Sequence, residues 1–214
     1  MSNKVRDFTN IRVFFSKTGN AKYISHLDLY RSFGRVIKRA KLPVWITEGF
    51  NPHIYVTFAL PLALGIESCE ESMDLRLIDD SELCALPTEK AGCFASVAEK
   101  LNAVMPRGLV ITRVAEPIRK ANEISRAVYE VKCASETLEA INTFLSQPKI
   151  EIEKRTKKNF QVIDVKPLLE WENGMLTLPA GSTLNINPWN VLSGFDDINV
   201  KRIKILCEDG GAFI

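Results

Sequence analysis

Residues 11–43 read IRVFFSKTGNAKYISHLDLYRSFGRVIKRAKLP and contain the clearest structural pattern of the chain. The apolar residues of this stretch first recur at every second position, which predicts a strand over residues 11–16. They then recur at three- and four-residue steps, which predicts an amphipathic helix over residues 26–41. Ser25 suits the N-cap of this helix, and Pro43 stops it. The stretch therefore predicts a strand followed by a helix, the start of an α+β unit.

The rest of the chain continues this pattern in two similar halves. The elements expected next in the first half are strands at 44–47, 54–58 and 73–77, a helix at 88–104 and a strand at 109–114. Those expected in the second half are strands at 129–133, 150–153, 160–169 and 175–178, helices at 138–145 and 188–193, and a strand at 200–207. Each half thus has the order of the ferredoxin-like split βαβ plan. We predict an α+β fold of two tandem ferredoxin-like units with antiparallel sheets, over residues 1–118 and 119–214.

Composition places the chain among ordinary globular proteins. Of its 214 residues, 46% are hydrophobic and 25% are charged, which excludes disordered and low-complexity classes. No apolar run approaches the roughly 18 residues of a membrane span. The first seven residues contain no apolar signal core, so we expect a cytoplasmic protein with no membrane association.

The five cysteines are odd in number, and no two of them are closer than nine residues. This spacing provides neither a C-x-x-C metal pair nor a disulfide framework, so reduced thiols are expected. The sequence also lacks the glycine-rich nucleotide-binding motifs, the G-x-S-x-G elbow and H-E-x-x-H. We therefore predict no metal and no cofactor.

Charge is distributed unevenly along the chain. Residues 1–60 contain ten Lys and Arg against three acids, a net charge of +7, whereas residues 61–100 contain three against nine, a net charge of −6. Such asymmetry indicates a nucleic acid or another acidic partner. Two oppositely charged surfaces that face one another explain it equally well.

Both histidines lie beside the predicted first helix or in the loop that follows it. His26 opens the helix, next to Asp28, and His53 ends the sequence Gly49-Phe50-Asn51-Pro52-His53. The positive end of the helix dipole disfavours a protonated imidazole, so His26 is suited to proton transfer. We list His26, His53 and Asp28 as candidate catalytic residues. The alternative is structural: Asp28 caps the helix, and the Asn-Pro pair shapes a turn.

A set of basic residues is the candidate surface for nucleic acid. On the predicted helix, cations recur at three- and four-residue steps and form one ridge, and Arg offers a bidentate fork to phosphate. A solvated helix face is the alternative. A second group of cations occupies a predicted hairpin tip near residue 155. The candidate nucleic-acid-binding residues are Lys17, Lys22, Arg31, Arg35, Lys38, Asn51, Lys154, Arg155, Lys157 and Lys158.

The first predicted strand suggests a further surface. Arg12 and Phe14 lie on the face opposite Val13, and basic, aromatic sheet faces are typical of RNA-stacking domains. We favour the alternative, in which the other domain covers this face.

Four motifs carry a resemblance to a known family. They are FSKTG at 15–19, YISHLD at 23–28, GFNPH at 49–53 and PLALG at 61–65. In content and order they resemble the bacterial radical-SAM-linked domain of unknown function. Ile54 and Ala63 stand where that family usually has proline. The family is also distantly similar to ferredoxin-like RNA-processing proteins of CRISPR systems.

The resemblance implies a partner but no established activity, because members occur fused to, or encoded beside, a radical-SAM protein. We therefore expect an RNA-binding accessory protein that presents RNA to a radical-SAM partner, with His26, Asp28, Asn51 and His53 forming a pocket at the end of the cationic ridge. Two alternatives remain open. One is a metal-independent endoribonuclease with His26 or His53 as general base, and the other is a protein–protein adaptor without RNA contact.

Overall fold

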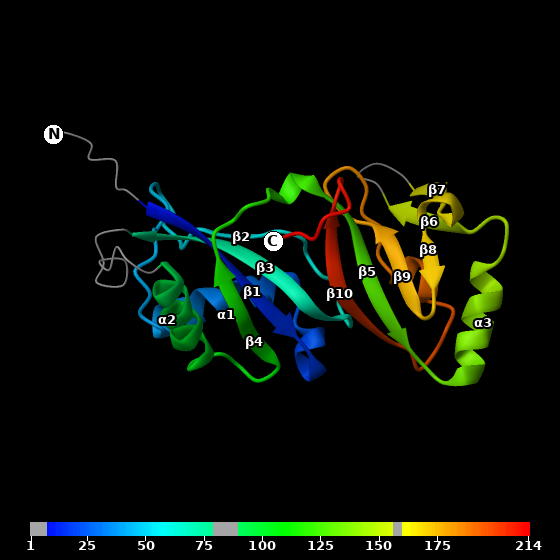
Figure 1. The fold of residues 1–214 in the computed structure, drawn as a ribbon, viewed down its shortest axis with the longest axis horizontal. Helices are drawn as coiled ribbons and strands as arrows, with labels where there is room; N and C mark the ends of the chain where they lie inside the picture. The colour runs from blue at the N-terminus through cyan, green and yellow to red at the C-terminus, as the bar shows by residue number, and fades with distance from the viewer. Residues whose placement is uncertain (1–7, 79–89, 156–159) are drawn as a thin grey trace. The chain divides into compact units, whose positions relative to one another are not determined.

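The computed structural model describes residues 8–78, 90–155 and 160–214, and the chain divides into two compact units (Figure 1). Unit 1 contains the described parts of Met1–Leu64 and Ser68–Lys120, together with Ile214. Unit 2 contains Gly65–Glu67 and Ala121–Phe213. The protein is a mixed α+β protein whose strands pair mostly antiparallel.

Unit 1 has the element order strand, helix, two strands, helix and strand. Its elements are β1 (Phe8–Lys17), the 3₁₀ turn η1 (Gly19–Tyr23), α1 (His26–Arg39), β2 (Val56–Phe58), β3 (Glu67–Ile78), α2 (Lys90–Asn102) and β4 (Leu109–Ala115). The strands pair antiparallel in the order β4-β1-β3-β2. Both helices contribute to one core with the inward-facing residues of β1, β3 and β4.

Helix α1 begins and ends where the sequence places its signals. Ser25 Oγ accepts a hydrogen bond from the Asp28 backbone N–H at 3.2 Å and donates to the Asp28 carboxylate at 2.7 Å. Leu29 and Phe33 are among the side chains that face the core. The predicted helix over residues 26–41 is confirmed, but it ends at Arg39, because Lys41 adopts a positive φ of 52° two residues before Pro43.

Removal of this cap tests how far α1 depends on local sequence. We expect Ser25→Ala to lower the free energy of unfolding by about 1 kcal/mol, since it leaves an N-terminal amide without its acceptor. Urea denaturation measures the change. Ser32→Ala is the matched control, because Ser32 is inside α1 and alanine is the better helix former. A loss in the control as large as in Ser25→Ala would contradict the capping role.

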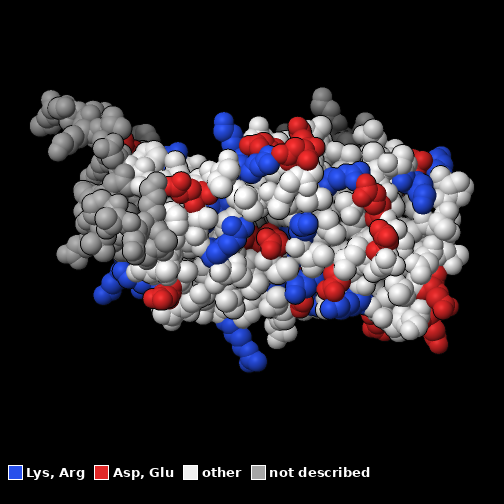
Figure 2. All heavy atoms as spheres, viewed as in Figure 1, with Lys and Arg blue, Asp and Glu red and all other residues white. Residues whose placement is uncertain are grey.

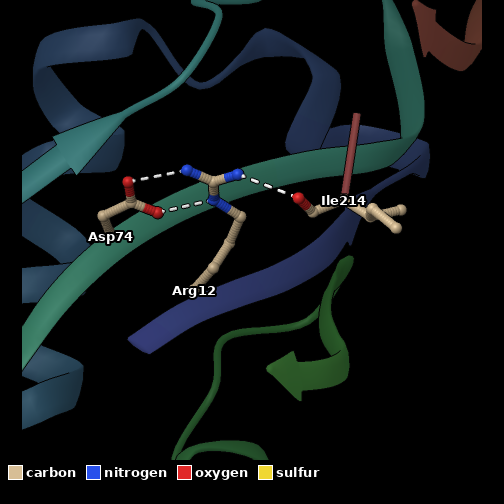
Figure 3. Close-up of polar contacts among 3 residues, drawn as sticks. All are labelled: Arg12, Asp74 and Ile214. Atoms are coloured by element: carbon tan, nitrogen blue, oxygen red, sulfur yellow. Dashed lines mark hydrogen bonds and ion pairs between the residues drawn. The ribbon is translucent and has the colours of Figure 1, made fainter. Parts of the chain in front are cut away.

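The outer face of β1 is covered at Arg12 and Phe14 by residues of the same unit, where we had favoured cover by the other domain. Phe14 is buried, and the Arg113 guanidinium lies 3.5 Å from its ring centroid. Arg12 is only 1% exposed and forms a bidentate pair with Asp74 on β3, with Nε–Oδ1 and Nη2–Oδ2 distances of 2.7 and 2.9 Å (Figure 3). Its Nη1 also donates to the backbone oxygen of Ile214 at 3.3 Å. Arg12 and Phe14 therefore offer no open stacking surface to RNA bases.

Unit 2 repeats the strand order of unit 1 with an added hairpin. Its elements are η2 (Ala121–Glu123), β5 (Ile124–Lys132), α3 (Ser135–Leu145), β6 (Glu151–Arg155), β7 (Phe160–Asp164), η3 (Lys166–Leu168), β8 (Glu170–Glu172), β9 (Met175–Pro179), α4 (Trp189–Leu192) and β10 (Asn199–Cys207). Four strands pair antiparallel in the order β10-β5-β9-β8. The β6–β7 hairpin forms a separate two-stranded sheet.

The carboxylate of Asp164 connects the end of β7 to both flanking segments through hydrogen bonds. Asp164 Oδ1 accepts hydrogen bonds from the backbone N–H groups of Ile150 and Lys166, at 3.0 and 3.1 Å. The bond from Ile150 is the main reason that the pKa of Asp164 lies below its usual value. The stabilisation is therefore present above the pKa of the unfolded chain and is lost as the pH falls through the lowered value.

The strand predicted at 44–47 is absent as a continuous element. Val44 bridges to Leu77 on β3, whereas Ile46 bridges to Ile54 in the segment that returns toward β2. Because neighbouring residues pair with different partners, no ladder forms, and the predicted strand at 54–58 is reduced to β2. Among the described residues, no helix is both long and apolar enough to cross a membrane.

Candidate functional site

The exposed side of α1 carries a row of cations. Arg31, Arg35 and Lys38 are all exposed and follow one another at four- and three-residue steps, so they share one face. Arg31 Nη1 lies 3.4 Å from Asp28 Oδ1, but both side chains are 60% exposed, so solvent screens this pair. Among the residues that the structure describes, Arg35 and Lys38 have no ion-pair partner. The row therefore keeps positive charge for an anionic ligand.

A hollow of about 350 Å³ lies beside this row. On the helix side it is lined by Tyr30, Arg31, Gly34, Arg35 and Lys38. On the other side it is lined by Pro52, His53, Ile54 and Val56. Its volume is at the lower end of the roughly 300–1,000 Å³ of ligand pockets. The structure thus brings the three predicted helix cations and His53 together around one concave surface.

The loop of the GFNPH motif holds the His53 ring in one tautomer. Thr47 and His53 face each other across the loop, since the Thr47 N–H donates to the His53 carbonyl at 2.8 Å and the His53 N–H donates to Thr47 Oγ1 at 3.1 Å. His53 Nδ1 lies 2.9 Å from the Asn51 carbonyl oxygen and 3.0 Å from Thr47 Oγ1. A carbonyl only accepts, so Nδ1 carries the proton. The neutral ring then has its lone pair at Nε2, ready to accept a hydrogen bond from a ligand.

His26 lies at the N-terminal end of α1, on a different side of the helix from the row of cations. It is exposed, and its ring packs edge-on against Phe58, with 5.1 Å between the centroids. Val56 and Phe58 are on the same face of β2, so this strand follows α1 from the hollow toward His26. Lys38 follows His26 by twelve positions, which is roughly 18 Å along the helix. His26 does not line the hollow, so the expected single pocket with both imidazoles is not what the structure shows.

Two predicted phosphate contacts, Lys17 and Lys22, do not line the hollow. Lys17 is only 1% exposed, and its ammonium donates to the carbonyl of Ile24 at 2.8 Å and to that of Lys22 at 3.5 Å. Lys17 therefore stabilises the connection between β1 and α1, and its assignment to an RNA surface is corrected. Lys22 is half-buried, with its ammonium 5.4 Å from the centroid of the Tyr23 ring.

The remaining predicted site residues lie in different parts of the protein. Asn51 is exposed in the loop, where its carbonyl orients His53. Asp28 accepts the bond from Ser25 described above and pairs with Arg31, an arrangement that fits the structural alternative of a helix cap. Lys154 and Arg155 end β6 in unit 2, and Lys157 and Lys158 lie outside the described residues.

Sequence reasoning missed several residues that line the hollow or belong to the loop segment that leads to it. Tyr30 and Gly34 line it from α1, Thr47 orients His53, and the side chain of Phe50 is fully exposed at 107%. Gly34 carried a usable signal, because glycine in the middle of a strongly periodic helix is unfavourable and needs an explanation.

The surface drawn in Figure 2 carries charged side chains of both signs. On the face drawn in Figure 2, Lys and Arg are interspersed with Asp and Glu, with neither sign dominating the coloured area.

Among residues 8–78, 90–155 and 160–214, no three His, Cys, Asp or Glu side chains gather closely enough to hold a metal ion. His26, Glu48 and His53, which are the two histidines and the acidic residue between them nearest to His53, form no such group.

Comparison with known proteins identifies the family. Residues 10–188 match the family described as uncharacterised proteins conserved in bacteria, DUF2344, so the chain belongs to this family. No curated protein matches the chain.

Proposed function

We propose that this DUF2344 member binds RNA in the hollow beside α1, with RNA phosphates held by Arg31, Arg35 and Lys38. The main support for this proposal is that these three exposed cations and the His53 imidazole line one concave surface. Guanidinium groups suit phosphate because they offer parallel N–H donors in a fixed fork. His53 Nε2 adds an acceptor that suits a ribose hydroxyl.

The same proposal treats each unit as a ferredoxin-like unit. The strand orders β4-β1-β3-β2 and β10-β5-β9-β8 support it, since each has a helix after the first strand and another before the last. In unit 2 the β6–β7 hairpin is then an insertion between α3 and β8. The motifs in the first 65 residues extend the proposal to an accessory role, in which the protein presents RNA to a radical-SAM partner.

The position of the histidines favours binding over cleavage by a pair of imidazoles. General acid–base cleavage of RNA needs proton-transfer groups within hydrogen-bond reach of the attacking and leaving oxygens. Only His53 lines the hollow, and His26 is beside Phe58, farther along α1. Cleavage that uses both imidazoles is therefore not supported, and His53 is left as the one histidine that could act as a general base at the hollow.

The salt dependence of binding tests the proposal. We expect the purified protein to bind a labelled uridine-rich RNA at low salt in a fluorescence-anisotropy titration. Three phosphate contacts predict a slope of about −2 for log affinity against log salt concentration, since each contact on a single strand contributes about −0.7. No binding at low salt overturns the proposal. A radical-SAM protein that co-purifies after nuclease treatment, from a chain that binds no RNA, would favour the adaptor function instead.

A further inference from the structure

Gly34 has no structural reason to be glycine in this fold. It lies inside α1, where its backbone has an ordinary helical conformation, and glycine is the least favourable helix residue after proline. A Cβ built on Gly34 meets no atom within 4 Å, so neither packing nor backbone geometry excludes a side chain. This contrasts with Gly108, where a Cβ would lie 2.6 Å from the Thr18 carbonyl oxygen.

The empty space at Gly34 belongs to the hollow. Gly34 is one turn from Tyr30 and one turn from Lys38, and it lines the hollow together with both. The missing side chain therefore deepens the floor between the cations Arg31 and Lys38. A site with this geometry lets a ligand approach the helix backbone closely, which is the usual reason for glycine at a binding surface.

The loop that contributes Pro52 and His53 to the hollow also carries an exposed aromatic ring. Phe50 is fully exposed, two residues before Pro52, which lines the hollow. Burial of this ring against protein would gain hydrophobic free energy, yet the fold leaves it in water. Exposed aromatic rings beside cationic grooves are the platforms on which unpaired bases stack.

We infer that the site takes single-stranded rather than duplex RNA, with one nucleotide seated over Gly34 and a base stacked on Phe50. This inference rests on the proposed function and specifies its ligand. In a duplex the bases are already stacked and paired, so Phe50 finds no free π-face, and the phosphates lie on a convex surface. An unpaired strand presents both a flexible backbone that enters the hollow and a base that turns onto the ring.

Competition between two RNA forms tests this inference. The probes are one labelled uridine-rich strand and the same strand annealed to its complement, each titrated against the full chain at low salt. We expect the single strand to bind at least tenfold more tightly. We expect Gly34→Leu to weaken single-strand binding at least tenfold, because the leucine side chain fills the hollow. The urea midpoint should not fall, because leucine is a better helix former than glycine. Gly194→Leu is the matched control, since a Cβ at Gly194 also meets open space but lies in unit 2.

The aromatic contact is tested separately. We expect Phe50→Leu to weaken single-strand binding several-fold, because leucine has no aromatic ring on which a base can stack. Phe50→Tyr keeps the ring and should retain the affinity. Equal or tighter binding of the duplex overturns the inference, as do unchanged affinities of both Gly34→Leu and Phe50→Leu. In either case the proposed function survives if the protein still binds RNA with the expected salt slope. If neither RNA form binds at low salt, the proposed function itself fails.

Discussion

Reversal of two charges on α1, Arg35→Glu with Lys38→Glu, is expected to lower RNA affinity on the order of a hundredfold. Both cations line the hollow and have no ion-pair partner among the described residues. Each charged hydrogen bond to phosphate contributes about 1.5 kcal/mol or more, and about 1.4 kcal/mol corresponds to a tenfold change in affinity. The salt slope should fall from about −2 to about −0.7, because Arg31 alone remains. Anisotropy titrations at several salt concentrations measure both quantities.

The matched control changes net charge equally at other places. Lys100 on α2 and Lys204 on β10 are exposed, and neither lines the hollow. We expect Lys100→Glu with Lys204→Glu to lower affinity only a few-fold through the long-range field. Because all four side chains are exposed, neither double variant should change the urea midpoint greatly. An equal loss of affinity in both double variants would show that net charge, and not the α1 site, determines binding.

Asp74→Ala is expected to destabilise the fold by about 2–3 kcal/mol. Arg12 is almost completely buried, and Asp74 accepts two of its guanidinium hydrogen bonds (Figure 3). Removal of one partner of a buried pair costs about 3–5 kcal/mol, because an uncompensated charge stays inside. We expect less here, since the Asp74 side chain is 29% exposed and water reaches the vacated site. Chemical denaturation provides the measurement.

A double-mutant cycle separates the pair from its surroundings. Arg12→Met with Asp74→Ala should be less destabilising than the sum of the two single changes, because the double variant buries no unpaired charge. Additive effects would contradict a direct interaction. Where the Asp74→Ala variant is folded, its RNA affinity should match that of the unchanged protein, since Asp74 does not line the hollow.

Local patterns predicted much of unit 1 correctly. The periodicity of residues 26–41 predicted α1 and its cationic face, because side chains three and four residues apart share a helix face in any context. Alternation predicted β1 and part of β3 for the same reason. In the second half, β6 and β7 lie on either side of the hairpin tip predicted near residue 155, and they pair antiparallel. The separate sheet formed by β6 and β7 did not follow, because strand partners are chosen by packing.

The contrast between Lys17 and Arg35 shows where local patterns stop. In sequence both are cations beside the YISHLD motif, yet Lys17 is buried against backbone carbonyls and Arg35 is exposed. Burial of Lys17 depends on where η1 packs against β1, a contact that no local period encodes. Lys17 was therefore assigned to the surface wrongly, while the exposed position of Arg35 followed from its place opposite the apolar stripe of α1.

The amino-acid sequence alone predicted α1, its N-cap at Ser25 and the positive charge of its exposed face, because these features depend on neighbours within one or two helical turns. Tertiary structure decided which side chains meet across space. The antiparallel pairing of β2 with β3 sets Val56 opposite Leu75, and α1 packs on that same sheet. This arrangement brings His53 to the cations and leaves His26 beside Phe58. Such long-range pairings are set by the packing of one shared core, and no single stretch of sequence contains them.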